Sequence, residues 1–227
     1  AFLLSYVFSQ ILLTLIITFL IFRVFFRGVT FKINISPIRP YLMYSIPLVP
    51  YSILIWVCQL SDRYMITHFL GLKQTGIYAC SYNIIGKAFI IYTVIAYVIY
   101  PHISSLWAKG SSGQVKYLLE KGGNIFLFFA IPITAGLTFL SRPIITLIAG
   151  ADFLVDPLLI FSICLGHIFL GMYVIYSYII DLSQKTYIAL FILIITALLN
   201  VALNLFLIPS WGIMGAAIAT LLTYTIQ

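Results

Sequence analysis

The stretch SYNIIGKAFIIYTVIAYVIY, residues 81–100, decides how the chain folds, because it is long and apolar enough to cross a bilayer as a helix. It carries a single charged side chain, Lys87, which lies about ten residues into the predicted span 77–100 and so close to mid-depth. A charge at that depth is costly, so ionisable residues in membrane spans are rare and mark functional sites. We therefore take Lys87 as the residue that most strongly indicates a functional site in the sequence.

The same apolar character extends along the whole 227-residue chain, in which 63% of the residues are hydrophobic and 7% are charged. Soluble domains carry about 25% charged residues, so the composition indicates a membrane protein. The predicted fold class is all-α: a polytopic transmembrane helix bundle with about seven spans. The predicted spans are residues 2–22, 42–68, 77–100, 123–141, 157–180, 187–208 and 212–227.

Basic residues alternate between the loops on the two sides of the predicted bundle. Most fall in one set of loops: Arg23, Arg27, Lys32, Arg39, Lys109, Lys116, Lys121 and Lys185. The opposite set holds Arg63, Lys73 and Arg142. The positive-inside rule then predicts that loops 23–41, 101–122 and 181–186 are cytoplasmic. Membrane orientation accounts for the net charge of +7, so no nucleic-acid partner is expected.

Motifs of enzymes and metal sites are absent from the sequence. The cysteines and histidines are scattered, without the spacing of a zinc site: Cys58, Cys80, Cys164, His68, His102 and His167. Paired carboxylates, a nucleophile elbow and a phosphate-binding glycine loop are also missing. We expect no metal, no cofactor and no enzymatic activity. Within loop 101–122, the segment SSGQVKYLLEK is interpreted as a short amphipathic helix on the cytoplasmic face, acting as a connector.

Two patterns near the end of the chain point to helix packing. Asn200 and Asn204 share one face of their predicted span and are typical of hydrogen bonds between membrane helices. Gly212, Gly215 and Ala219 form a series of small residues, which lets neighbouring helices approach closely.

The candidate site is built around Lys87. Asn83 lies four residues earlier and so on the same helix face, and Gly86 beside them permits close approach of a helix or a ligand. The functional interpretation is a cationic site for an anionic group in a water-filled cavity. The alternatives are a lysine paired with a buried carboxylate or one that extends to a membrane edge. We favour the functional interpretation, because reaching an edge across half a bilayer is strained.

Three polar residues of the preceding span are further candidates. Gln59, Asp62 and Ile66 lie on one stripe of a helix, and Arg63 is turned by about 100° from Asp62. They either line the same cavity, with Asp62 as a charge partner of Lys87 or Arg63, or mark a helix end at the membrane surface. The sequence leaves both interpretations open.

The order of several motifs resembles polysaccharide flippases of the Wzx type, in the multidrug/oligosaccharidyl-lipid/polysaccharide exporter superfamily. The first is the proline-bearing stretch YSIPLVPYSILIWVCQLSDRYMITHFLGLKQTGIY, with Asp62–Arg63 followed by FLG and TGIY. The second is ALLNVALNLFLIPSWGIMGAAIATLLTY near the end. The run RPIITLIAGADFLVDPLL is similar to the family's external loop. The resemblance covers the chain from about residue 36 onward.

The resemblance implies one lobe of a two-lobed, inverted-V transporter. On that plan, residues 1–22 are the last helix of the N-lobe, 23–41 a basic cytoplasmic linker, and 42–227 a six-helix C-lobe with its last helix cut short. The chain begins with Ala rather than Met and opens within an apolar run. We therefore expect a fragment of a longer protein whose missing N-lobe is its partner.

The resemblance also implies the substrate, a polyprenyl-diphosphate-linked oligosaccharide moved from the inner to the outer leaflet for O-antigen, capsule or lipopolysaccharide assembly. Lys87, helped by Arg63, would pair with the diphosphate or an acidic sugar, and Asn83 and Gln59 would also contact the substrate. Asp62 would limit anion affinity or take part in coupling to an ion. The expected location is the bacterial inner membrane. A multidrug or cation exporter of the same superfamily and a membrane polysaccharide polymerase are the alternatives. The first needs more deep carboxylates, and the second a large external loop.

Overall fold

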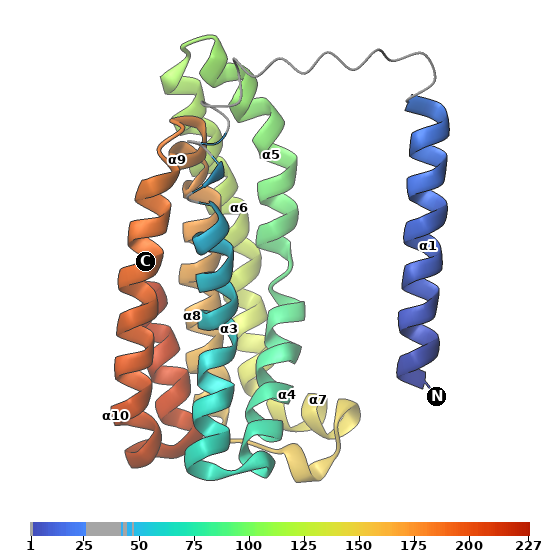
Figure 1. The fold of residues 1–227 in the computed structure, drawn as a ribbon. Coiled ribbons are helices and arrows are strands. Elements are labelled where there is room, and N and C mark those ends of the chain that lie inside the picture. Colours follow the sequence, from blue (N-terminus) through green and yellow to red (C-terminus); the bar gives the residue numbers. More distant parts are fainter. Residues whose placement is uncertain (1, 26–41, 43–44, 47) are drawn as a thin grey trace. The chain divides into compact units, whose positions relative to one another are not determined.

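The computed structural model describes residues 2–25, 42, 45–46 and 48–227. The predicted linker 23–41 lies outside these residues from position 26 onward. Within the described ranges the chain is helical and contains no β-strand, which confirms the all-α class (Figure 1). The chain divides into two compact units, residues Ala1–Tyr41 and Leu42–Gln227, and each is described by itself.

The first unit contains one described helix, α1 (Phe2–Phe25). Its sequence is a run of Leu, Ile and Phe with neither Gly nor Pro, so nothing interrupts the backbone hydrogen bonds. At about 1.5 Å per residue it is roughly 36 Å long, enough to cross the hydrocarbon layer of a bilayer.

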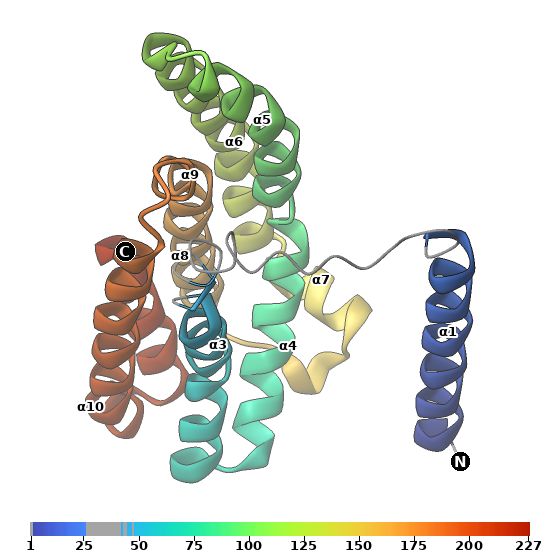
Figure 2. The same cartoon turned by 45° about the horizontal axis from the view of Figure 1, so that its top comes forward.

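The second unit is an up-and-down bundle of helices (Figures 1 and 2). Its described elements are α3 (Leu48–Leu70), α4 (Leu72–Ala88), α5 (Ile91–Ala108), α6 (Ser112–Phe139), α7 (Ser141–Ile148), the 3₁₀ turn η1 (Ala151–Phe153), α8 (Pro157–Tyr176), α9 (Tyr178–Leu182) and α10 (Thr186–Ile226).

By length and hydropathy, five stretches of the described residues qualify as membrane spans: Ser5–Arg23, Leu72–Ala108, Ser112–Phe139, Pro157–Leu182 and Thr186–Ile226. This confirms a multi-pass helical membrane protein. The count is lower than the predicted seven for two reasons. First, predicted spans 187–208 and 212–227 are the two legs of α10. Second, predicted span 42–68 corresponds to α3, which is not among the five because its second half is polar.

A reversal at Gly212 separates the two legs of α10. Gly212 has φ 61° and ψ −143°, a conformation that only glycine adopts without strain. The second leg then packs back on the first, with Gly215, Ala216 and Ala219 buried, as expected for the small-residue series. A Cβ atom on Gly215 would lie 2.1 Å from the backbone oxygen of Leu207, so the two legs touch backbone to backbone.

We expect Gly215→Ala to destabilise the bundle by about 1–3 kcal/mol or more, because the methyl group meets a backbone atom that cannot move aside. Thermal unfolding of the purified protein in detergent measures the effect. The control is Gly113→Ala on α6, where an added Cβ meets nothing within 4 Å. Equal melting temperatures for the two variants would contradict the close contact.

The connections gather at the two ends of the second unit. Those between α5 and α6 and between α9 and α10 lie at one end, which we call the basic end because it holds Lys109 and Lys185 (Figure 1). The α3–α4 turn, α7 and the bend of α10 lie at the other end, which we call the distal end. The segment SSGQVKYLLEK was predicted to be a separate interfacial helix. This prediction is wrong, because the segment forms the N-cap and first turns of α6.

Candidate functional site

Three predicted residues meet on one outward face of α3 and α4. The Arg63 Nη2 group donates a hydrogen bond to Asn83 Oδ1 at 3.4 Å. Asn83 and Lys87 are both exposed and lie one helical turn apart on α4. We call Arg63, Asn83 and Lys87 the cationic face. Among the described residues, neither Arg63 nor Lys87 forms a salt bridge with a carboxylate.

The Arg63 side chain is held in place by an aromatic ring. Its guanidinium carbon lies 5.8 Å from the centre of the Tyr82 ring, within cation–π range. The Arg63 Nε atom is buried without a hydrogen-bond partner. Ring contact and the Asn83 bond therefore orient the guanidinium, while leaving part of its hydrogen-bonding capacity unused.

The helix that carries Lys87 is interrupted directly after it. α4 ends at Ala88 and α5 begins at Ile91. The Ile90 N–H group donates to the oxygen of Lys87 at 3.4 Å, three residues back instead of four. Discontinuous helices recur at the binding sites of membrane transporters. The interruption falls within the apolar stretch Leu72–Ala108, at the level of the cationic face.

A buried histidine packs behind the same point. His167 of α8 contacts the rings of Tyr82 and Phe89, with centroids 5.1 and 5.6 Å away. Its Nδ1 atom lies 2.9 Å from the Ile163 oxygen, and its Nε2 atom would lie 3.6 Å from a Cβ on Gly86. The packing of His167 against α4 was not predicted, because the contact joins residues far apart in the chain.

Asp62 does not belong to the cationic face. Its side chain is 5% exposed and points into the bundle, and its Oδ1 atom accepts from the backbone N–H of Arg63 at 2.7 Å. No ion pair joins Asp62 to Arg63 or Lys87 in the described part of the chain. Arg63 nevertheless acts on the Asp62 carboxylate through space, because the two side chains are turned by only about 100° around α3. The role of Asp62 as a charge partner of Arg63 or Lys87 therefore stays a prediction.

Asp62 faces hydroxyl groups of the bundle interior. Its carboxylate interacts with Tyr78 of α4, whose buried hydroxyl makes no hydrogen bond of ordinary geometry. Thr220 and Tyr224, on the second leg of α10, lie around the same pair. Asp62 is thus a buried carboxylate among hydroxyl groups, without a salt bridge in the described part of the chain.

A chain of polar contacts continues from Ser61, the residue before Asp62. Ser61 Oγ donates to Asn200 Oδ1 at 3.0 Å, and Asn204 Nδ2 donates to the same oxygen at 3.0 Å. Asn200 Nδ2 reaches Thr223 Oγ1 at 3.4 Å. These bonds tie α3 to both legs of α10, which confirms Asn200 as an interhelical hydrogen-bonding residue. Ser61, Tyr78 and Thr223 were not predicted.

Gln59 lines a cavity of about 200 Å³ between α3, α8 and α10, together with Cys58, Asn200, Thr223 and Tyr224. Its side chain is exposed and lies four residues before Arg63, on the same side of α3. The sharing of one site by Gln59 and Lys87 stays a prediction.

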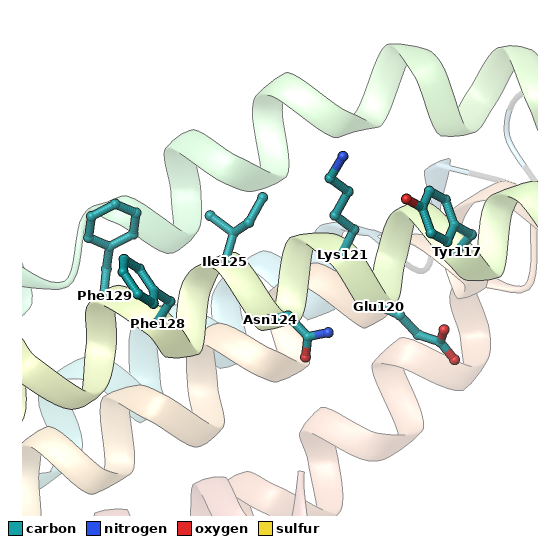
Figure 3. Close-up of a pocket in the computed structure, with 7 residues that line it drawn as sticks. All are labelled: Tyr117, Glu120, Lys121, Asn124, Ile125, Phe128 and Phe129. Carbon is teal, nitrogen blue, oxygen red and sulfur yellow. The ribbon is translucent and has the colours of Figure 1, made fainter.

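A shallow pocket also lies on the outer surface of α6. Figure 3 shows its side chains, which come from this one helix: Tyr117, Glu120, Lys121, Asn124, Ile125, Phe128 and Phe129. Lys121 lies 6.0 Å from the Tyr117 ring centre, and the nearby Lys116–Glu120 pair at 3.8 Å is exposed. Exposed pairs contribute about 0–1 kcal/mol, so we assign no ligand to this single-helix surface.

Metal ligands are not clustered in the part of the chain that the structure describes: it holds no group of three or more His, Cys, Asp or Glu residues suited to a metal ion.

Fold and site together define a multi-pass helical membrane protein that carries two cationic side chains on an outward face of α3 and α4 and one buried carboxylate on α3. The chain belongs to the polysaccharide biosynthesis protein family, whose model matches residues 1–156.

Relatives with names come from the archaeon Haloferax volcanii. The probable low-salt glycan biosynthesis flippase Agl15 is 24% identical, over 73% of this chain and 35% of that protein. The probable flippase AglR is 27% identical, over 86% of this chain and 43% of that protein. An uncharacterized membrane protein of Methanocaldococcus jannaschii is 29% identical, over 73% and 33%.

The chain thus spans between a third and somewhat over two fifths of the length of these relatives. No solved structure matches it significantly. The family and the two named relatives indicate a flippase-type protein of polysaccharide biosynthesis.

Proposed function

We propose that the protein containing this chain moves a polyprenyl-diphosphate-linked oligosaccharide from the inner to the outer leaflet of the membrane. The observation that carries the proposal is the cationic face, where Arg63 and Lys87 present positive charge and form no salt bridge among the described residues. One relative is named a probable flippase of low-salt glycan biosynthesis and another a probable flippase, which supports the same class of substrate.

The chemistry of the substrate matches this face. A diphosphate is strongly solvated and cannot enter hydrocarbon without losing water, so a path across the membrane must supply opposite charge. Arg63 offers planar N–H donors that suit phosphate oxygens, and Lys87 offers a compact ammonium group. Asn83, bonded to Arg63 and one turn from Lys87, fixes the spacing between the two cations.

The transport path needs a second lobe. We propose residues 1–22 as the last helix of an N-lobe, 23–41 as a cytoplasmic linker and 42–227 as the C-lobe, with the remaining N-lobe supplied by the rest of the protein. The division of the chain after Tyr41 supports this arrangement. Rocking of the two lobes would expose the cationic face alternately to each side, and the interruption between α4 and α5 gives the lining helix a point at which to bend.

Asp62 is proposed as the residue that couples transport to an ion. Its side chain is 5% exposed, interacts with the hydroxyl of Tyr78, and is turned by about 100° around α3 from that of Arg63. A buried carboxylate in this setting is suited to bind a small cation or a proton, and it is poorly placed to weaken the binding of the anion. This favours ion coupling over the alternative role of limiting anion affinity.

Membrane side and cell type belong to the same proposal. The basic end is proposed to face the cytoplasm by the positive-inside rule, and the protein to lie in the cytoplasmic membrane. The relatives are archaeal, so a surface glycan of an archaeon fits the proposal as well as a bacterial O-antigen or capsule. A multidrug exporter is less favoured, since Asp62 is the one acidic side chain buried among the described residues.

Deletion of the full gene tests the proposed function in the cell. We expect loss of surface polysaccharide, with lipid-linked repeat units stranded on the inner leaflet. Repeat units that reach the outer leaflet but stay unpolymerised would indicate a polymerase. Unchanged surface polysaccharide would indicate an exporter of other compounds.

A further inference from the structure

A cavity of about 600 Å³ lies at the distal end of the second unit, away from the cationic face. Four segments form it: the end of α3, the start of α4, the stretch before α8, and the bend of α10. The side chains used below are Gln74, Ile77, Asp156, Leu159 and Trp211. Its volume falls in the range of small-molecule sites, about 300–1,000 Å³.

The backbone around the cavity is fixed by local structure. Asp156 caps α8, its Oδ1 atom accepting from the Leu158 N–H at 2.8 Å. On the other side, the positive φ of Gly212 sets the turn that presents Trp211. These two features hold the carboxylate and the indole ring at the cavity before any ligand binds.

The lining chemistry selects for one class of ligand. Trp211 is 58% exposed and offers an apolar ring face and one N–H donor. Gln74 adds an amide and Asp156 a carboxylate, over a floor of Ile77 and Leu159. Asp156 is the only charged side chain in the lining, so an anionic headgroup is disfavoured, and a single carboxylate is a poor cation site. A neutral sugar ring, with an apolar C–H face and hydroxyl groups at its edge, fits all of these groups.

We infer that this cavity binds a neutral sugar of the lipid-linked oligosaccharide, an inference that rests on the proposed function. Gln74 and Lys87 lie on the same helix, about 20 Å apart along its axis and turned by about 140° around it. The two sites therefore recognise different parts of one amphipathic substrate. The cationic face binds the diphosphate, and the cavity holds sugar at the end of the bundle where the glycan emerges.

Trp211 has a simpler role if it only anchors the protein at the membrane surface, as aromatic residues often do. An anchor needs the indole ring alone, whereas a sugar site also needs Gln74 and Asp156. Substitution of these two polar residues therefore separates the two roles.

The experiment uses the full-length protein with every tryptophan except Trp211 replaced by phenylalanine. The probe is the neutral glycan released by mild acid from the host's lipid-linked repeat unit, titrated against Trp211 fluorescence. We expect a saturable change, and about tenfold weaker binding for Gln74→Ala and for Asp156→Asn, since one lost hot-spot contact costs more than 1 kcal/mol. Asparagine caps a helix as well as aspartate does, so α8 is preserved. No saturable change, or binding unaffected by both substitutions, overturns the inference.

A second probe separates this inference from the proposed function. Binding of sugar-free polyprenyl diphosphate reports on the cationic face, and we expect Lys87→Ala to weaken it without changing glycan binding. If the diphosphate binds but the glycan does not, the sugar site is refuted and the proposed function stands. If neither binds, both are refuted.

Discussion

Lys87→Ala in the full-length protein is expected to reduce export of the lipid-linked oligosaccharide by at least about tenfold, because the passage of a diphosphate then loses a charge-assisted contact of about 1.5–3 kcal/mol. The amount of protein in the membrane is expected to stay unchanged, since Lys87 is exposed and has no ion pair among the described residues. Surface polysaccharide in a deletion strain carrying the variant gene measures the effect.

The matched control for this variant is Lys73→Ala. Lys73 is also an exposed lysine of α4, but it lies in the first turn at the distal end. The Lys73→Ala variant should export the oligosaccharide at close to the wild-type rate. The Lys87→Arg variant should retain most of the export, because the positive charge is kept. Normal export by Lys87→Ala, or an equal loss with Lys73→Ala, would remove Lys87 from the substrate path.

Asp62→Asn is expected to make transport independent of the driving ion. Asparagine has nearly the same shape, and the buried Asp62 carboxylate forms no salt bridge among the described residues, so the substitution breaks no ion pair and is expected to leave the fold intact. Purified wild-type protein in liposomes should move substrate faster under either a sodium or a proton gradient. The variant should show the same slow rate with and without that gradient.

The control for Asp62→Asn is Asp152→Asn, at an exposed carboxylate of η1. It should respond to the gradient as wild type does. A gradient response preserved in Asp62→Asn would show that the buried carboxylate is not the coupling group, and Asp62 would then be a structural residue that packs against Tyr78.

Sequence periodicity predicted best those features that depend on a single helix, without contacts to other helices. The apolar runs predicted the helical membrane fold, and the spacing of Asn83 and Lys87 predicted that they share a face of α4. The same reasoning limited the prediction for α6. A change from polar to apolar residues near position 122 looked like a helix boundary, whereas the backbone runs unbroken from Ser112 to Phe139.

Contacts between helices were beyond the reach of a single sequence. The bond from Ser61 to Asn200 joins residues 139 positions apart, and neither residue carries a signal for the other. The separation of Asp62 from Arg63 follows from the helical turn of about 100° per residue. However, the sequence did not reveal which of the two faces the interior, because that depends on where α10 packs.

The most direct test of the central claim is the movement of the host's lipid-linked repeat unit by the purified full-length protein in liposomes. Accessibility of the glycan to an added lectin reports the leaflet. Wild-type protein should transfer the repeat unit between leaflets, and Lys87→Ala should do so at least about tenfold more slowly at equal protein content. Equal rates for the two proteins would contradict the assignment of the cationic face as the diphosphate path.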